Sequence, residues 1–194
     1  MIKPTFYKSF RSRRYRDLQE TSKSTIDILK KSNNIILDVG FGTGESTISL
    51  VDNNPDYLIC GVEAYKPGIR VLIKKNILNH YGDALEFLEK IDRNAISKIY
   101  MLFPDPWQKR KHRKRRLFNK YTFNIIERIL VKKGVFHFAS DNINYAIQAK
   151  DVIQKACVKK ISFSKNRGCR PITKYEKKAL AKNKFIFDIV YTKY

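Results

Sequence analysis

The sequence predicts an α/β fold in which helices cover both faces of a doubly wound, mostly parallel sheet. Two observations lead to this prediction. Short β-rich runs alternate with helical runs from residue 34 to residue 193, and a glycine-rich turn follows the first of these runs directly. Strands separated by helices form right-handed βαβ units, which build a parallel sheet.

The first half of the chain supplies two strands and three helices. The β-branched run 34–39 predicts a buried strand, and the helix over 44–53 starts just after the glycine turn. A second strand is expected at 57–63, followed by a helix at 66–76. Apolar residues at helical spacing predict another helix over 83–91.

The second half continues the alternation. An apolar run predicts a strand at 97–103, and helical spacing predicts an amphipathic helix at 118–130. A strand at 134–140 and a helix at 142–156 come next, and strict alternation predicts a closing strand within 184–193. Ligands of such sheets bind beyond the carboxyl ends of the strands, so residues that follow these ends are the candidates for function.

Charge divides the chain into three blocks. The net charge is +22 over 194 residues, and residues 1–31 carry 9 basic and 3 acidic groups. Residues 32–108 hold 7 basic and 10 acidic groups, whereas residues 109–194 hold 24 and 5. The asymmetry indicates nucleic acid or an anionic membrane surface as partner, with a merely solvated basic surface as the alternative. We predict a basic N-terminal arm over 1–31 and a single domain over 32–194.

Cysteines and the N-terminus bear on the compartment. Three widely separated cysteines without a CxxC pair indicate free thiols in a reducing compartment, with no disulfide framework and no zinc site: Cys60, Cys157 and Cys169. No apolar run approaches membrane-spanning length. The segment "YKSFRSRRYR" favours an arm that touches the ligand, and an organelle transit peptide is the alternative.

The glycine loop "LDVGFGTGES" follows the first strand. Gly40, Gly42 and Gly44 let the backbone approach a ligand and turn into a helix. Nicotinamide enzymes use a related loop, so this motif alone is weak. Asp38, on the strand just before the glycines, would repel a pyrophosphate and suits a ligand with a cationic end.

Two further acids extend this site. Glu63 closes the second strand, where a carboxylate accepts both ribose hydroxyls of an adenosine. Asp83 is placed to accept from an adenine amino group, to cap the helix after it, or to do both. A ribose and an adenine with no phosphate describe S-adenosylmethionine.

A stiff acidic turn is followed at once by the densest positive charge. In "FPDPWQKRKHRKRR", Asp105 lies between two prolines, and residues 109–116 hold seven Lys or Arg and one His. A nuclear-localisation-like patch would explain the charges but not their position. We expect phosphate contacts from Arg110, Lys111, Arg113, Lys114, Arg115 and Arg116.

Aromatic and histidine residues near this turn have open roles. Trp107 could stack on a flipped base or pack as a lid on the core. His80, His112 and His137 stand singly, without the spacing of metal ligands, so we interpret them as structural or RNA-facing and expect no metal site.

Six segments together resemble one family. "ILDVGFGTGES", "GVEAYKPGI", "GDALEFL", "LFPDPWQKRKHRKRR", "FASDNINYA" and "RPITKYE" are similar to the bacterial tRNA guanine-N7 methyltransferases, from about residue 34 to the C-terminus. The resemblance implies a Rossmann-like class I methyltransferase fold with an antiparallel C-terminal strand. It also implies a cytoplasmic enzyme that transfers the methyl group of S-adenosylmethionine to the variable-loop guanosine at position 46 of tRNA.

The resemblance assigns roles residue by residue. Its cofactor acids fall on Asp38, Glu63, Asp83 and Asp105. Its substrate positions fall on Lys109, Asp141, Thr173, Lys174, Tyr175 and Glu176. The chain between Glu63 and Asp83 is shorter than the family pattern, which predicts a trimmed third strand and helix. The segment "KKALAKNK" replaces the family's glycine and histidine in the last segment.

Guanine N7 is a nucleophilic lone pair at neutral pH, so the reaction needs alignment and water exclusion more than a strong base. A carboxylate can hold the guanine N1 and N2 donors and offset the charge that the purine gains. Asp105 is the first candidate for this catalytic role and Asp141 the second.

Three other functions compete with this interpretation. A nicotinamide oxidoreductase explains the glycine loop but not the turn or the basic C-terminal block. A non-catalytic RNA-binding module and a methyltransferase acting on another base, for instance on an exocyclic amine, are the other two. A monomer and a homodimer are both compatible with the sequence.

Overall fold

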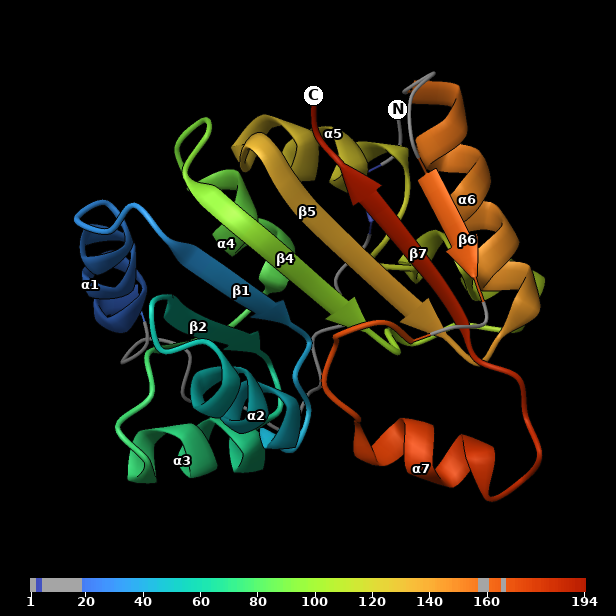
Figure 1. Ribbon diagram of the computed structural model, residues 1–194, viewed down its shortest axis with the longest axis horizontal. Helices are drawn as coiled ribbons and strands as arrows, with labels where there is room; N and C mark the ends of the chain where they lie inside the picture. Colours follow the sequence, from blue (N-terminus) through green and yellow to red (C-terminus); the bar gives the residue numbers. More distant parts are fainter. Residues whose placement is uncertain (1–2, 5–18, 157–160, 165–166) are drawn as a thin grey trace.

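A single twisted sheet forms the centre of the computed structural model, which describes residues 3–4, 19–156, 161–164 and 167–194 (Figure 1). The strands lie in the order β3-β2-β1-β4-β5-β7-β6. Their bounds are β1 Ile35–Val39, β2 Leu58–Glu63, β3 Asn79–Tyr81, β4 Ile96–Leu102, β5 Leu130–Ser140, β6 Ile161–Ser164 and β7 Phe187–Thr192.

Strand directions confirm the predicted fold class. β1 pairs in parallel with β2 and β4, and the parallel pairing extends to β3 on one side and β5 on the other. β7 is antiparallel to both of its neighbours, β5 and β6. The sheet is therefore mostly parallel with an antiparallel C-terminal strand, and its order reverses between β1 and β4, which is where such sheets bind ligands.

Helices cover both faces of the sheet. Their bounds are α1 Gln19–Leu29, α2 Glu45–Asn53, α3 Lys66–Lys74, α4 Ala84–Glu89, α5 Lys120–Ile129, α6 Ile143–Ala156 and α7 Lys174–Leu180, with a 3-10 helix η2 at Arg110–Arg115. Alternate residues of β1 point to opposite faces. Leu37 belongs to the main core with α1, α4, α5 and α6, whereas Ile36 packs with Leu50 of α2.

All ten predicted elements are present, with shifted ends. The largest shift is in β5, which starts at Leu130 instead of 134 because Leu130 already has extended dihedral angles and pairs with Ile96. Four elements and η2 were not among the ten expected elements: α1, β3, β6 and α7. The three-residue β3 agrees with the expected trimming between Glu63 and Asp83.

The predicted arm over 1–31 lies partly outside the described residues. Its described part includes α1, whose Ile26 and Leu29 are buried in the main core. The Thr25 hydroxyl donates to the Asn79 carbonyl of β3 at 3.1 Å, so α1 packs against the sheet edge.

Two of the three cysteines lie among the described residues. Cys60 is buried and Cys169 exposed, and both are free thiols, whereas Cys157 lies outside the described residues. Within the described part of the chain, every helix is too short or too polar to cross a membrane.

Candidate active site

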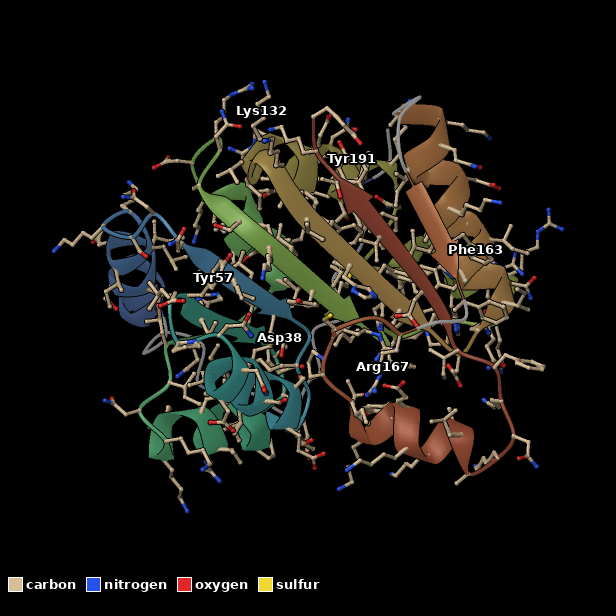
Figure 2. The ribbon with its side chains drawn as sticks, viewed as in Figure 1. Asp38, Tyr57, Lys132, Phe163, Arg167 and Tyr191 are labelled. Atoms are coloured by element: carbon tan, nitrogen blue, oxygen red, sulfur yellow. The ribbon has the colours of Figure 1, made fainter. Side chains whose placement is uncertain are left out.

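A cavity of about 670 Å³ opens at the carboxyl ends of β1, β2 and β4. All four predicted cofactor acids line it: Asp38, Glu63, Asp83 and Asp105. They come from four different strand ends, which the parallel sheet brings to one edge. Asp38 is labelled in Figure 2, near the end of β1 and beside α2.

The glycine loop forms one wall of the cavity. Gly40, Gly42 and Gly44 have φ values of 77°, 62° and 92°, a region that residues with a side chain rarely adopt. Gly40 and Gly42 line the cavity. Gly44, predicted to bind the cofactor, does not line it; an added Cβ there would lie 3.2 Å from Leu72 Cδ2, so this glycine serves the packing of α3 on the loop.

Gly68 of α3 is a residue that sequence reasoning missed. A Cβ at this position would lie 1.8 Å from the carbonyl oxygen of Gly42, which is not compatible with the observed packing. The backbone of α3 therefore packs directly against the backbone of the glycine loop. A Pro-Gly pair at a helix start was the available signal, because glycine costs stability inside a helix unless close packing needs it.

The Glu63 carboxylate organises the loops around the cavity. It accepts hydrogen bonds from the backbone N–H groups of Gly42 at 2.7 Å, Ala64 at 2.6 Å and Tyr65 at 2.9 Å. Burial raises the pKa of Glu63, and the three backbone donors oppose that rise. Glu63 thus stabilises the glycine loop and still presents lone pairs to the cavity.

Asp38 is buried, and only one of its two carboxylate oxygens has hydrogen-bond partners among the described residues. Its Oδ2 accepts from Ser46 at 2.7 Å and from Thr47 at 2.8 Å. Its Oδ1 is buried without a hydrogen-bond partner among the described residues. Burial raises the pKa of Asp38 to about 6, although the hydrogen bonds from the two hydroxyl groups lower it. A buried acceptor with a free oxygen at a cavity wall fits the ammonium group of S-adenosylmethionine.

Asp83 combines the two roles considered for it. Its side chain caps α4 by accepting from the backbone N–H groups of Leu85 at 2.6 Å and Glu86 at 3.2 Å. It also lines the cavity. Burial raises the pKa of Asp83, which the two backbone donors oppose.

The turn after β4 presents Asp105 at the cavity. Phe103 and Trp107, on either side of the Pro-Asp-Pro sequence, have positive φ values of 55° and 40°. Asp105 is exposed, and Trp107 lines the cavity. The Trp107 ring meets the His112 ring edge-on at 5.8 Å, and the Arg115 guanidinium lies 5.0 Å above it. Trp107 is therefore part of the cavity wall, beside the basic helix.

The basic run forms η2, and its members do not share one environment. Lys109, the residue before η2, is exposed, as are Arg110, Lys111, Arg113 and Lys114. Arg115 is half-buried on Trp107. Arg116 is only 2% exposed, and its Nε donates to the Pro106 carbonyl at 2.8 Å. Arg116 was also predicted to contact phosphate, but its guanidinium faces the protein interior in this structure.

The "RPITKYE" segment closes the cavity from the other side. Thr173 and Tyr175 line the cavity, and Lys174 is exposed. The Thr173 hydroxyl caps α7 by accepting from the backbone N–H of Glu176 at 3.1 Å. Glu176, predicted to contact substrate, is buried and binds Arg170 at 2.6 Å instead, so it has no free face toward a substrate.

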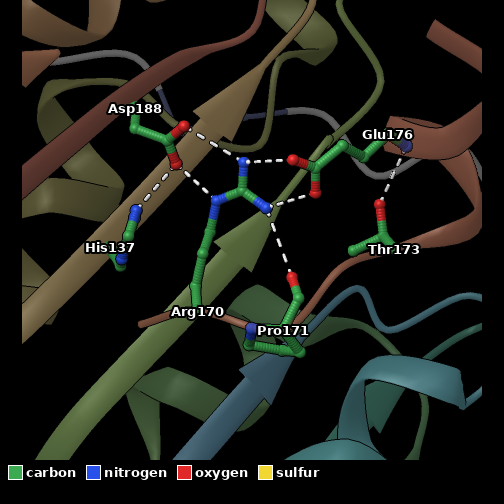
Figure 3. Close-up of polar contacts among 6 residues, drawn as sticks. All are labelled: His137, Arg170, Pro171, Thr173, Glu176 and Asp188. Atoms are coloured by element: carbon green, nitrogen blue, oxygen red, sulfur yellow. Dashed lines mark hydrogen bonds and ion pairs between the residues drawn. The ribbon is translucent and has the colours of Figure 1, made fainter. Parts of the chain in front are cut away.

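A buried ionic network holds this segment on the sheet (Figure 3). Arg170 reaches Glu176 with both terminal nitrogens and Asp188 of β7 with Nε and with Nη2, the latter at 3.0 Å. His137 of β5 binds the same Asp188 at 2.8 Å. Sequence reasoning missed Arg170 and Asp188. The signal was an aspartate at an inward position of the alternating last strand.

The three histidines have no common partner. His137 is structural, as shown by its bond to Asp188. His80 is buried and stacked on Phe87, and burial lowers its pKa to about 4. His112 lies in the basic helix beside Trp107. Among the described residues, His, Cys, Asp and Glu form no group able to hold a metal ion.

Asp141, the second catalytic candidate, is not brought to the cavity. It follows β5 and forms an ion pair with Lys184 at 2.7 Å. It is not among the residues that line the cavity, so the structure does not bring it together with Asp105 there.

The fold and the acid-lined cavity define a class I, S-adenosylmethionine-dependent methyltransferase. Solved structures share the fold: an S-adenosylmethionine-dependent methyltransferase from Archaeoglobus fulgidus has a TM-score of 0.59 at 10% identity, covering 91% of this chain and 96% of that chain. A precorrin-6y C5,15-methyltransferase from Geobacter metallireducens GS-15 has a TM-score of 0.58 at 13% identity, covering 98% and 94%.

Sequence comparison gives the family. The model of a family described as "Putative methyltransferase" matches residues 32–189. A tRNA (guanine-N(7)-)-methyltransferase of Buchnera aphidicola subsp. Acyrthosiphon pisum (strain Tuc7) is 36% identical over 188 residues, 90% of this chain and 79% of the relative. The Francisella philomiragia protein of that name is 34% identical over 186 residues, 90% and 81%. The chain belongs to the tRNA (guanine-N7-)-methyltransferase family, which excludes the nicotinamide alternative.

Proposed function

We propose that the protein methylates N7 of guanosine in tRNA, at position 46 of the variable loop, with S-adenosylmethionine as donor. The observation that carries the proposal is one cavity lined by four acids, with an exposed basic helix, η2, at its edge. The acids suit a donor with a cationic end and no phosphate. The basic helix suits a polyanion.

Three acids are assigned to the donor. S-adenosylmethionine, when bound, supplies a methyl group activated by its sulfonium. Glu63, at the end of β2, accepts the ribose hydroxyls, and Asp83 accepts from the adenine amino group. The unpartnered Oδ1 of Asp38 accepts from the ammonium group. These contacts bind and orient the donor, and they take no part in the methyl transfer itself.

Asp105 is assigned to the guanine. Its carboxylate accepts from N1 and N2 of the base and stabilises the positive charge that the purine gains on methylation. No general base is needed, because guanine N7 carries a free lone pair at neutral pH. Trp107, on the cavity wall, is placed to stack on the base.

Two basic surfaces are assigned to the RNA backbone. One is the exposed part of the run that contains η2, with Lys109, Arg110, Lys111, Arg113 and Lys114. The other is α7 and the turn after it, where the exposed Lys174, Lys177, Lys178 and Lys182 recur at helical spacing opposite the buried Glu176 and Ala179. Lysine and arginine contacts to phosphate position the RNA, and we expect specificity from tRNA shape. A bacterial enzyme of this kind meets its substrate in the cytoplasm, which we propose as its location.

The decisive test is to map the methylated base. Purified full-length protein is incubated with an unmodified tRNA transcript and isotope-labelled S-adenosylmethionine, and the digested RNA is analysed by mass spectrometry. We expect 7-methylguanosine at position 46 and no label in a matched transcript with adenosine there. Label on an exocyclic amine would support the alternative base methyltransferase. No methylation together with RNA binding would support the non-catalytic RNA-binding module.

A further inference from the structure

The last arginine of the basic run is buried, unlike the others. Arg116 is 2% exposed, whereas Arg110 and Arg113 of the same run are exposed. A guanidinium is costly to remove from water unless hydrogen bonds replace the lost hydration. Its contacts therefore indicate what it does in the fold.

Every partner of Arg116 within the described residues is neutral. Nε donates to the carbonyl of Pro106 at 2.8 Å, and Nη1 donates to Oε1 of Gln148 at 2.5 Å. The guanidinium carbon lies 4.6 Å from the ring centroid of Tyr145, in a cation–π contact. Gln148 and Tyr145 belong to α6. Arg116 thus links the turn after β4 to a helix that follows the next strand.

The turn that Arg116 contacts has an unfavourable backbone at both ends. Phe103 and Trp107 have positive φ values although neither is glycine. Such residues keep this conformation only where surrounding contacts hold them. Asp105 lies between them, so its position at the cavity depends on those contacts.

The two ends of the turn are held by different contacts. At the start, the Phe103 N–H donates to the Ala139 carbonyl at 2.8 Å, and the Arg170 guanidinium lies 5.5 Å from the Phe103 ring centroid. At the far end, the Arg116 side chain binds the carbonyl of Pro106, the residue next to Asp105. A side chain that fixes this carbonyl also fixes the peptide plane between Pro106 and Trp107, and the rigid ring of Pro106 joins that plane to Asp105.

We infer that Arg116 is a positioning residue, whose buried guanidinium holds the Pro104–Trp107 turn so that Asp105 faces the cavity. It acts through Asp105 and touches neither RNA nor donor. The expected effect of Arg116 on methylation rests on the proposed function, whereas its effect on the conformation of the turn does not.

The turn can be observed without any substrate. Trp107 is the single tryptophan of the chain, so fluorescence excited at a wavelength where the 11 tyrosines absorb little reports on this turn. We compare Arg116→Met with Arg113→Met, which removes the same groups from an exposed position. Arg116→Met should shift the emission of Trp107 and increase its quenching by acrylamide, and Arg113→Met should not. Equal spectra and quenching in Arg116→Met and parent would overturn the inference.

Kinetics then separate positioning from RNA binding. Single-turnover methylation at saturating donor and tRNA should fall about 10²-fold in Arg116→Met, the scale of a small misplacement of a reacting group. The salt dependence of tRNA binding should stay as in the parent, whereas Arg113→Met should lower its log–log slope by about 0.7–0.9. A reduced slope in Arg116→Met would instead make it a phosphate contact.

A double-mutant cycle tests whether Arg116 acts through Asp105. Adding Arg116→Met to Asp105→Asn should cause little further loss of rate, because both changes remove the same interaction. Rate losses that multiply would contradict the inference.

A second variant keeps the inference testable if Arg116→Met does not fold. If circular dichroism shows Arg116→Met unfolded, Gln148→Met removes one acceptor of the guanidinium, 32 residues away in sequence. It should reproduce the fluorescence change in weaker form, and an unchanged spectrum would count against the inference. A parent protein that methylates no tRNA would refute the proposed function, while the fluorescence comparison would still decide the role of Arg116.

Discussion

Glu63 binds the backbone of the glycine loop and is proposed to bind the donor ribose, and two substitutions distinguish these roles. Glu63→Ala should weaken S-adenosylmethionine binding by about 1.5–3 kcal/mol, the scale of lost charge-assisted hydrogen bonds. Glu63→Gln should cost less, because the amide oxygen still accepts from the Gly42 N–H that the carboxylate now binds at 2.7 Å. Calorimetric titration measures both. Equal affinity in Glu63→Ala and parent would refute the ribose assignment, and tRNA affinity, measured in parallel, should stay unchanged.

Asp38 predicts a pH dependence of donor binding. Its pKa is raised to about 6 by burial, so the carboxyl is neutral below that pH and charged above it. A cationic ligand favours the charged form, and affinity should therefore rise between about pH 5 and 7 with a midpoint near 6. In Asp38→Asn the rise should disappear. Isothermal titration at several pH values checks this, and an unchanged profile in the mutant would assign the titration to another group.

The proposed role of Asp105 predicts that its replacement lowers the methylation rate without changing how that rate depends on pH. In Asp105→Asn, single-turnover methylation should fall by about 10²–10³-fold, the scale for removing one preorganised electrostatic group. The assay needs saturating S-adenosylmethionine, because the same residue lines the donor cavity. Binding of tRNA should change little.

The pH profile of Asp105→Asn distinguishes two roles. Guanine N7 needs no deprotonation, so the parent rate should be nearly flat between roughly pH 7 and 8.5. A steep rise that the mutation abolishes would make Asp105 a general base. If Asp105→Asn has the same rate as the parent, Asp105 serves only the structure of the turn.

At the scale of one element, η2 predicts the salt dependence of RNA binding. Replacing Arg110, Arg113 and Lys114 with Ala should weaken tRNA binding and lower the log–log salt slope by about 0.7–0.9 for each lost phosphate contact. All three side chains are exposed, so folding should be unaffected. Filter binding at several salt concentrations measures the slope. If the slope is unchanged, this face of η2 points away from the RNA.

At the scale of the whole molecule, Arg170 joins segments that are distant in sequence. Arg170→Met leaves Asp188 and Glu176 buried without their cation, which should cost about 3–5 kcal/mol of unfolding free energy. Lys182→Met, at an exposed position, is the matched control and should stay within about 0.5 kcal/mol. Urea denaturation followed by circular dichroism measures both. A loss below 1 kcal/mol in Arg170→Met would mean that the network adds little to stability.

The same network predicts how stability varies with pH. Burial alone would raise the pKa of Asp188, but its bonds to His137 and Arg170 lower it below the ordinary value. Stability from a lowered carboxyl pKa is present above the unfolded pKa, about 3.9, and is lost as the pH falls through the folded pKa. The stability difference between the parent and Arg170→Met should therefore be large at pH 7 and shrink below about pH 4.

The sequence by itself determined ten of the strands and helices and the four acids of the cavity. These elements follow from local periodicity, and the acids stand near the carboxyl ends of strands, so a parallel sheet gathers them at one edge. Asp105 in its proline turn and Glu63 at the end of β2 needed no knowledge of distant residues.

Only the tertiary structure decided which charged residues are buried. Arg116 and Arg113 are alike in sequence, three positions apart in one basic run, yet one faces α6 and the other solvent. Asp141 and Glu176 were predicted to contact substrate, and only the structure shows that Lys184 and Arg170 bind them. Burial and ion pairing depend on groups distant in the chain, and local composition carries no information about which distant side chain will arrive.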